Sequence, residues 1–408
     1  MDTEIILLNI SGQDKPGLIA RVTKVLSKFD AKILDLSQSN IHNTVSLGVL
    51  FQIQNNMHRQ SLLKDLLFTC YELNVSPKFK HIRSFEYENW VENQNKYIVT
   101  LLGEHLAAKE ISAVTKVVSD FNLNIDSVKR LTERISLLKQ KNYPRASIEL
   151  SISGTLDNKT SVTEKFMKIS RDFNIDIAFQ EDNLYRKNKR LVCFDMDSTL
   201  IQTEVINELA EMRGVGDQVR KITTSAMRGE IDFKHSFIER MKLLKGLKLE
   251  ELDKIANNLP ITKGAFRLIN TLKSYGYKTA IISGGFTYFG QYLKTKLNID
   301  YMYANELEIS EGKLTGGYIG DIIDGNKKAE LLKKIAAKEQ VNLGQTIAVG
   351  DGANDIPMLN TAGLGIAFHA QPKVKKNAQN SISSIGLDGI LYLIGLHDKD
   401  IINKNQSY

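Results

Sequence analysis

Hydrophobic and polar positions follow one pattern in the first 180 residues of the chain and a different one after residue 190. In the first part, runs that alternate apolar and polar residues flank stretches with a helical repeat. The apolar residues of VTKVLSKF (22–29), for example, occupy positions i, i+3, i+4 and i+7, which predicts a helix with one buried face. In the second part, short uninterrupted apolar runs alternate with helical stretches, a pattern typical of buried parallel strands.

The first part contains an internal repeat. The octamer at residues 22–29 returns as VTKVVSDF at residues 114–121, 92 residues later. A strand-like run precedes each octamer, and an alternating run follows it. The order β-α-β-β-α-β in both copies predicts an antiparallel sheet with two helices on one face, the ferredoxin-like arrangement. The expected later elements are strand 44–54, helix 57–72 and strand 77–84 in the first copy, and strand 146–153, helix 161–172 and strand 175–179 in the second.

We therefore expect two small domains, at residues 1–85 and 96–180, joined by a polar linker at 86–95. A second linker at 181–189 leads to a third domain at 190–408. The densest basic run of the chain, RKNKR at residues 186–190, lies at this boundary. We interpret it as a solvated linker, because short runs of like charge are usually solvated.

The third domain begins a different fold. Apolar runs at 191–194, 278–282 and 346–349 predict buried strands, and helical stretches such as 265–274 and 327–338 lie between them. This pattern predicts an α/β fold, a doubly wound Rossmann-like core. A mostly helical insert at about 205–260 is expected to form a cap over the carboxyl ends of the strands, where such folds bind ligands.

Polar motifs directly follow these strands. Asp195 and Asp197 come after the run 191–194, and two carboxylates at the end of a buried strand are costly unless a cation offsets their charge. Magnesium prefers oxygen ligands and suits such a position. Ser283 and Gly284 follow the second run, where a hydroxyl and free backbone N–H groups can hold phosphate oxygens.

Two more motifs complete the set. Lys327 and Lys328 open the expected helix 327–338, and a lysine there can balance phosphate charge. The sequence GDGAND at 350–355 places two aspartates at the end of the third strand, where they suit a metal site.

These four motifs, in this order, resemble those of the haloacid dehalogenase superfamily of aspartyl-phosphate phosphohydrolases, over about residues 190–408. The resemblance implies that Asp195 is the nucleophile and that Asp197 is the general acid and base. It implies a Mg²⁺ ion, with Asp355 bracing its waters. The implied metal ligands are the Asp195 carboxylate, the Asp197 backbone carbonyl and Asp351, and the implied substrate ligands include Ser283, Gly284, Lys328 and Asn354. Lys328 is preferred to Lys327 because it aligns with the superfamily lysine.

Within the superfamily, the motifs are most similar to those of members that hydrolyse O-phospho-L-serine to L-serine and phosphate, the last step of L-serine biosynthesis. The resemblance assigns Glu204 to the substrate ammonium and Arg240 to its carboxylate. Met227 and Phe233 match apolar cap residues that close over the site. Three alternatives stay open: another small phosphomonoester, a phosphoprotein substrate, and an amino-acid-sensing regulator with an inactive phosphatase domain.

The two repeats resemble ACT domains, the amino-acid-sensing modules of metabolic enzymes. The resemblance rests on size, element order and the first loop, in which Pro16 can start a helix and Gly17 permits close approach of a ligand. It implies a regulatory amino acid, such as serine, near Asp14 and Gly17. The second copy has Gly103-Glu104-His105 at this place and lacks the Pro-Gly pair. Pairing of such sheets between subunits implies a homodimer.

Composition narrows the class of protein. The 408 residues are 42% hydrophobic and 25% charged, close to ordinary globular usage. Two cysteines cannot build a disulfide framework, and no run of about 20 apolar residues indicates a membrane span. The net charge of +7 comes from scattered lysines, so we expect neither a nucleic-acid nor a membrane partner. We expect a cytoplasmic protein.

Overall fold

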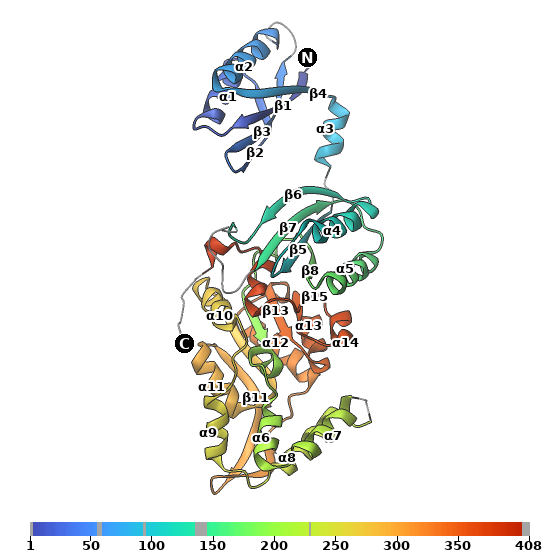
Figure 1. Ribbon diagram of the computed structural model, residues 1–408, viewed down its shortest axis with the longest axis vertical. Coiled ribbons are helices and arrows are strands. Elements are labelled where there is room, and N and C mark those ends of the chain that lie inside the picture. The colour runs from blue at the N-terminus through green and yellow to red at the C-terminus, as the bar shows by residue number, and fades with distance from the viewer. Residues whose placement is uncertain (1–2, 55–58, 93–94, 135–144, 228–229, 402–408) are drawn as a thin grey trace. The chain divides into compact units, whose positions relative to one another are not determined.

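The computed structural model describes residues 3–54, 59–92, 95–134, 145–227 and 230–401. It contains two compact units, residues 1–93 and 94–408 (Figure 1). Within the described residues, no helix combines the length and the apolarity needed to span a membrane.

The first unit is one β-α-β-β-α-β domain followed by a helix. Its antiparallel sheet has the order β2-β3-β1-β4, and Leu8 and Ile10 on β1 face the two helices while Asn9 between them is exposed. This alternation is the reason that one face of the sheet packs and the other does not. The elements are β1 (Thr3–Gln13), α1 (Leu18–Ser27), β2 (Lys32–Ile41), β3 (Thr44–Gln54), α2 (Arg59–Leu73), β4 (Val75–Ile82) and α3 (Ser84–Val91).

Helix α3 differs from the prediction. The segment 86–95 was expected to be a polar linker, and no helix was predicted in it. Ser84–Val91 is helical, with Glu86 accepting a hydrogen bond from the Arg83 backbone N–H. None of the residues of α3 is buried, so this helix has no buried face. The helix was therefore not predicted from this polar composition. Its first-turn glutamate stabilises the start of the helix.

The second unit begins with the repeat. Its sheet has the order β6-β7-β5-β8, the same topology as the first sheet, and its helices pack on one face through residues such as Val99 and Leu101. The predicted ferredoxin-like arrangement of both copies is confirmed. The elements are β5 (Lys96–Gly103), α4 (Ala108–Asp120), β6 (Asn124–Arg130), β7 (Ala146–Ser153), α5 (Lys159–Phe173) and β8 (Asp176–Glu181).

The remainder of the second unit is the predicted doubly wound α/β core. Six parallel strands and an antiparallel edge strand follow the order β12-β11-β10-β9-β13-β14-β15. Val192 and Phe194 of β9 contact one helix layer that includes α10 and α11, and Leu191 and Cys193 contact the other, which includes α12 and α13. The elements are β9 (Leu191–Phe194), α10 (Ala265–Ser274), β10 (Lys278–Phe286), α11 (Thr287–Leu297), β11 (Tyr301–Ser310), β12 (Lys313–Ile319), α12 (Gly325–Lys338), β13 (Thr346–Gly350), α13 (Ile356–Thr361), β14 (Leu364–Phe368), α14 (Pro372–Asn377), β15 (Asn380–Ile382) and α15 (Ile390–Leu393).

A helical cap interrupts this core between β9 and α10. It contains α6 (Val205–Arg213), α7 (Gly216–Met227), α8 (Phe233–Leu243) and α9 (Leu249–Asn257). The chain leaves and re-enters the core as two short neighbouring segments, since Gln202 N donates to Pro260 O and Thr262 N donates to Leu200 O, each at 2.9 Å. These paired segments form the hinge of the cap. The antiparallel hairpin β11–β12, which the sequence pattern did not predict, packs against α8.

The basic run 186–190 is not the solvated linker that we expected. Arg186 is only 2% exposed and forms an ion pair with the buried Glu149 of β7, and Lys189 is 4% exposed and donates to Gly344 O at 2.7 Å. The prediction was wrong because a long cationic side chain can be buried when a tertiary partner meets its charge, and that partner lies far away in the sequence.

Candidate active site

The four sequence motifs meet at the carboxyl ends of β9, β10 and β13. Residues of the first, second and fourth motifs line a cavity of about 690 Å³ that lies between these strand ends and the helical cap, whereas Lys328 of the third motif is buried and is not among the lining residues. The cavity combines core motifs with cap side chains, as the fold predicts for a site at the switch point of a doubly wound sheet. Of the residues singled out in the sequence, the lining contains Asp195, Asp197, Glu204, Phe233, Arg240, Ser283, Gly284, Asp351 and Asn354.

Asp195 lies at the centre of this arrangement. Its backbone N–H donates to Val349 O at 2.9 Å, which continues the pairing of β9 with β13 to the edge of the site. Its Oδ1 accepts from the Met196 backbone N–H at 2.7 Å and lies 2.9 Å from Lys328 Nζ. The carboxylate is thus fixed by the main chain and by a cation, and it is only 5% exposed.

Lys328 is completely buried beneath the strand ends, on the first turn of α12. Its Nζ lies 2.7 Å from Asp355 as well as 2.9 Å from Asp195. Burial alone would lower the pKa of this ammonium group, but the two carboxylates outweigh burial and raise the pKa. Lys327, by contrast, points to the surface and pairs with Glu330 at 2.9 Å.

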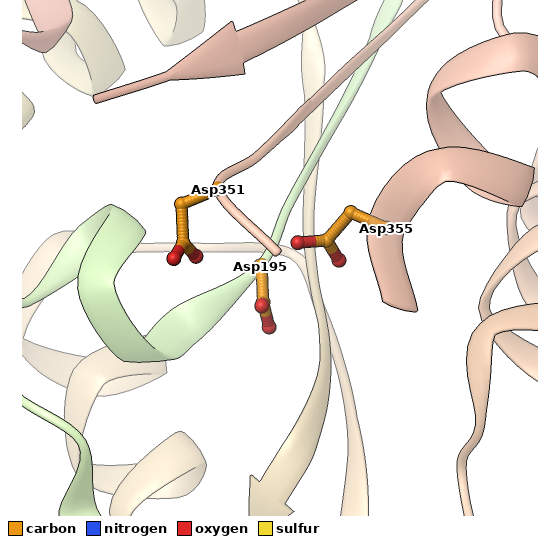
Figure 2. Close-up of side chains that lie close together, drawn as sticks. All are labelled: Asp195, Asp351 and Asp355. Atoms are coloured by element: carbon orange, nitrogen blue, oxygen red, sulfur yellow. The ribbon is translucent and has the colours of Figure 1, made fainter. Parts of the chain in front are cut away.

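Three carboxylates form a candidate metal centre. Oxygen atoms of Asp195, Asp351 and Asp355 all lie within 4.8 Å of one another, and Figure 2 shows the side chains converging from two strand ends and the start of a helix. Burial, followed by repulsion from Asp195, raises the pKa of Asp351 to about 8 and that of Asp355 to about 7. Hard oxygen donors with an excess of negative charge fit a magnesium ion, which would offset that charge.

Asp197 follows Asp195 by two residues, and its side chain has different surroundings. It lies in a turn, Met196–Leu200, in which Ser198 takes a left-handed backbone conformation with φ 54°. The Asp197 carboxylate accepts from the Val205 backbone N–H at 3.3 Å. Burial, then repulsion from Glu204 and Asp195, holds the pKa of Asp197 well above its usual range. Its carboxyl group is therefore suited to carrying a proton.

Glu204 and Arg240 bring opposite charges from the cap to the cavity. Glu204 precedes α6 and accepts from Ser198 Oγ at 2.9 Å, and burial raises the pKa of its carboxyl group. Arg240, on α8, donates from Nε to Ser236 O at 3.2 Å, and burial lowers the pKa of its guanidinium. Phe233 begins α8 and lines the same cavity near Gly284. The Met227 side chain lies outside the described residues.

The end of β10 and the loop after β13 both contribute residues to the cavity lining. Ser283 Oγ accepts from the Gly285 backbone N–H at 3.0 Å and is buried, whereas Gly284 contributes only backbone. The buried Asn305 of β11 fixes this backbone, because its Nδ2 donates to Gly284 O at 2.7 Å and its Oδ1 accepts from Ile323 N at 2.8 Å. Sequence reasoning missed Asn305, since one amide within an alternating strand gives no local signal.

The site also includes residues that were not singled out in the sequence, among them Ser198 in the lining and the buried Thr199. Ser198 holds Glu204, and Thr199 donates to Asp351 at 3.3 Å. Both belong to the DMDST motif, so the motif itself could have indicated them. Other unpredicted polar residues of the lining include Asn207, Thr223, Gln371 and Lys373, which carry no recognisable pattern.

The proposed regulatory residues lie in the first unit, on the loop before α1. Asp14 and Gly17 are both exposed, and Asn40 Nδ2 donates to the Asp14 carboxylate. Gly17 caps α1 with φ 91°, and no atom lies within 4 Å of where a Cβ would stand. Glycine is therefore required here by its backbone conformation rather than by close approach of another group.

Comparison with known proteins agrees with this architecture. Residues 189–363 match the haloacid dehalogenase-like hydrolase family, and residues 4–80 and 96–180 each match ACT domain families. The phosphoserine phosphatase of Streptomyces coelicolor is 36% identical over 98% of this chain and 94% of that protein. Phosphoserine phosphatase SerB2 of Mycobacterium tuberculosis is 34% identical over 96% of this chain and 93% of that protein.

A solved structure supports the same assignment. The unliganded probable phosphoserine phosphatase of Vibrio cholerae has a TM-score of 0.58 and 33% identity, covering 74% of this chain and 86% of that one. Near-complete coverage of the curated relatives, together with the three domain matches, establishes the relationship over the whole length. The chain belongs to the phosphoserine phosphatase family, with two ACT domains ahead of a haloacid dehalogenase-like hydrolase domain.

Proposed function

We propose that this protein hydrolyses O-phospho-L-serine to L-serine and phosphate with the help of Mg²⁺. The observation that carries the proposal is that one cavity contains the Asp195 carboxylate and, on the cap side, the opposite charges of Glu204 and Arg240. The ammonium and the carboxylate of such a phosphate ester complement Glu204 and Arg240, and its phosphorus would lie within reach of the Asp195 carboxylate.

In the first step, an oxygen of the Asp195 carboxylate attacks phosphorus in line with the serine oxygen. The new bond joins Asp195 to phosphorus, and the bond from phosphorus to the serine oxygen breaks. Asp197 gives its proton to that oxygen, so that neutral serine leaves. Magnesium, held by Asp195, the Asp197 carbonyl and Asp351 with Asp355 behind it, would supply positive charge to the transferring group.

In the second step, the Asp197 carboxylate takes a proton from water. That water attacks phosphorus, the bond from phosphorus to Asp195 breaks, and phosphate leaves. In this proposal, the oxygens of the phosphate are held by the Ser283 hydroxyl, the Gly284 backbone N–H and the Lys328 ammonium. Asn354, which also lines the cavity, completes the substrate contacts.

The cap confers specificity in this proposal. Glu204 meets the substrate ammonium, and the Arg240 fork binds the carboxylate. Phe233 and, by the resemblance to the family, Met227 exclude water from the closed site. Other small phosphomonoesters lack one or both charged groups, so they would lose these contacts.

For the first ACT domain, we propose a regulatory amino acid, with serine as the candidate, at the loop that contains Asp14 and Gly17. The exposed carboxylate of Asp14 and the open space around Gly17 support this position. The homodimer, the cytoplasmic location and the place at the end of serine biosynthesis stay predictions that follow from the same family relationship.

A substrate panel tests the proposed function. Phosphate release is measured from phosphoserine, phosphothreonine, phosphoethanolamine, 3-phosphoglycerate and an aryl phosphate, with Mg²⁺ and with a chelator. The highest kcat/KM is expected for phosphoserine, with loss of turnover on chelation. A higher kcat/KM for an ester without the amino-acid head group would overturn the assignment of substrate, and turnover that resists chelation would overturn the metal assignment.

A further inference from the structure

The second ACT domain shares a hydrophobic core with the phosphatase domain. The face of its sheet that does not contact α4 and α5 packs against the C-terminal segment of the phosphatase domain, and β8 lies beside β15 (Figure 1). Leu102 and Ala178 from this face belong to the same cluster as Leu387, Leu391 and Leu393. The two domains therefore bury apolar surface against each other, which stabilises them as one unit.

Polar contacts fix the register of this packing. The Asp176 carboxylate accepts from the backbone N–H groups of Ser383 and Ser384, at 2.7 and 2.8 Å, and from Ser384 Oγ at 2.6 Å. Gln180 Nε2 donates to Leu393 O at 3.0 Å. In the first ACT domain the equivalent sheet face carries exposed side chains, including Asn9, Ser46 and Lys78. The second repeat therefore differs from the first in carrying buried apolar and hydrogen-bonding side chains on this face.

Asp388 stands where this docking meets the phosphatase core. Its buried carboxylate accepts from Arg145, at the edge of β7, and from Arg267 Nη1 of α10 at 2.8 Å. Arg267 Nη2 also lies 3.2 Å from Asp398, which in turn accepts from the Glu133 backbone N–H at 2.8 Å. Two aspartates of the C-terminal segment therefore join Arg267 to two points of the second ACT domain.

The same carboxylate lies against the returning segment of the cap hinge. Gly264 caps α10 with φ 84°, and a Cβ there would overlap Asp388 Oδ1. Next to it, Leu387 N donates to Lys263 O at 2.8 Å. Two residues before Gly264, Thr262 N donates to Leu200 O at 2.9 Å. Leu200 ends the turn that contains Asp197. A short run of bonded segments thus joins Asp388 to the hinge and to the catalytic turn.

We propose that Asp388 is a positioning residue that holds the return hinge of the cap at residues 262–264, with the second ACT domain supporting it through Arg145. The hinge connects the core to the cap helices that present Arg240 and Phe233 to the substrate. With a neutral side chain at position 388, Arg267 and Arg145 lose their shared charged partner, and the hinge is less firmly held. The closed cap is then less populated, which reduces apparent affinity for a substrate that depends on the cap.

The kinetic test rests on the proposed function and uses the full-length protein. For Asp388→Asn we expect KM for phosphoserine to rise at least fivefold while kcat changes less than twofold. An aryl phosphate, which has no head group for Arg240, should show less than a twofold change in KM. Arg145→Met should shift KM in the same direction but less, because Arg267 still meets Asp388. Glu181→Gln is the matched control, since its exposed pair with Lys159 at 2.8 Å lies on the same ACT domain away from the hinge.

Amide hydrogen exchange supplies a readout without substrate. In Asp388→Asn, the amides of Thr262, Ala265 and Leu268 should exchange at least tenfold faster than in the wild type, while the β13 amides of Ala348 and Val349 keep their protection. Unchanged exchange at the hinge, or an equal increase at the hinge and β13, would overturn the positioning role. If the wild type does not hydrolyse phosphoserine, the proposed function fails and the exchange result alone decides this inference.

Discussion

Replacement of Arg240 by alanine tests whether the cap recognises an amino-acid head group. Among the described residues, the one hydrogen bond of this guanidinium runs from Nε to Ser236 O at 3.2 Å, so its two Nη groups stay available to the cavity. A carboxylate that accepts from both would form a charge-assisted bidentate contact of about 2–3 kcal/mol. Arg240→Ala should therefore lower kcat/KM for phosphoserine by roughly 30- to 150-fold.

The assay compares phosphoserine with an aryl phosphate at saturating Mg²⁺. The aryl ester lacks the carboxylate, so its kcat/KM should change less than about threefold, within about 0.7 kcal/mol. Lys242→Ala removes a positive charge from the exposed side of the same helix and should leave both substrates unaffected. Equal losses on both substrates would refute the reasoning, because Arg240 would then serve the phosphate or the packing of the cap.

Three further changes have distinct expected outcomes. Asp197→Asn should lower kcat by about 10²–10⁴-fold, because protonation of the leaving group and activation of water both depend on that carboxyl group. The rate of phosphate release is measured by stopped flow, and a rate within threefold of wild type would show that Asp197 does not have this role. Burial lowers the pKa of Lys189 to about 8, below its unfolded value of 10.5, so the cost of burying its charge is greatest below pH 8 and disappears as pH rises to 10.5. The free energy of unfolding of Lys189→Met, measured in urea relative to that of wild type, should therefore be higher at pH 7 than at pH 10.5, by up to about 3 kcal/mol. A difference that does not depend on pH would contradict the buried charge. Every chemical motif lies after residue 190, but a fragment of residues 182–408 exposes the apolar face that the second ACT domain covers. This fragment should therefore aggregate, or melt at least 10 °C below a fragment of residues 94–408. Equal melting temperatures would show that the shared core contributes little.

The sequence predicted elements whose signals are local. The uninterrupted run at 191–194 and the periodic stretch 265–274 occur as β9 and α10 with the same bounds. A strand buried on both faces requires consecutive apolar residues, and a helix buried on one side requires apolar residues at helical spacing, so both can be recognised in the sequence. The same holds for the DMDST motif, since a carboxylate pair after a buried strand combines a chemical requirement with a position in the fold. Its residues line the predicted edge of the sheet.

Features that depend on distant partners could not be found in this way. In the sequence Arg186 is one charge in a basic run, and the partner that allows its burial is Glu149, 37 residues earlier on β7. Asn305 gains its importance from two backbone groups, at Gly284 and Ile323, that the fold brings to either side of its amide. For the same reason, the docking of the second ACT domain through Asp176 had no counterpart in the repeat pattern, which is alike in both copies.

The most direct test of the central claim is to trap and locate the phosphoryl group on the enzyme. Wild-type protein with Mg²⁺ is mixed with phosphoserine that carries radiolabelled phosphorus and is quenched in acid within milliseconds. One half is counted for label bound to the protein, and the other half is treated with borohydride, which reduces an aspartyl-phosphate to homoserine and releases the phosphate. Asp195→Asn serves as the control. The account predicts homoserine at position 195 in the wild type and no labelled protein in the variant. Homoserine at another position, or turnover without any labelled protein, would contradict Asp195 as the nucleophile.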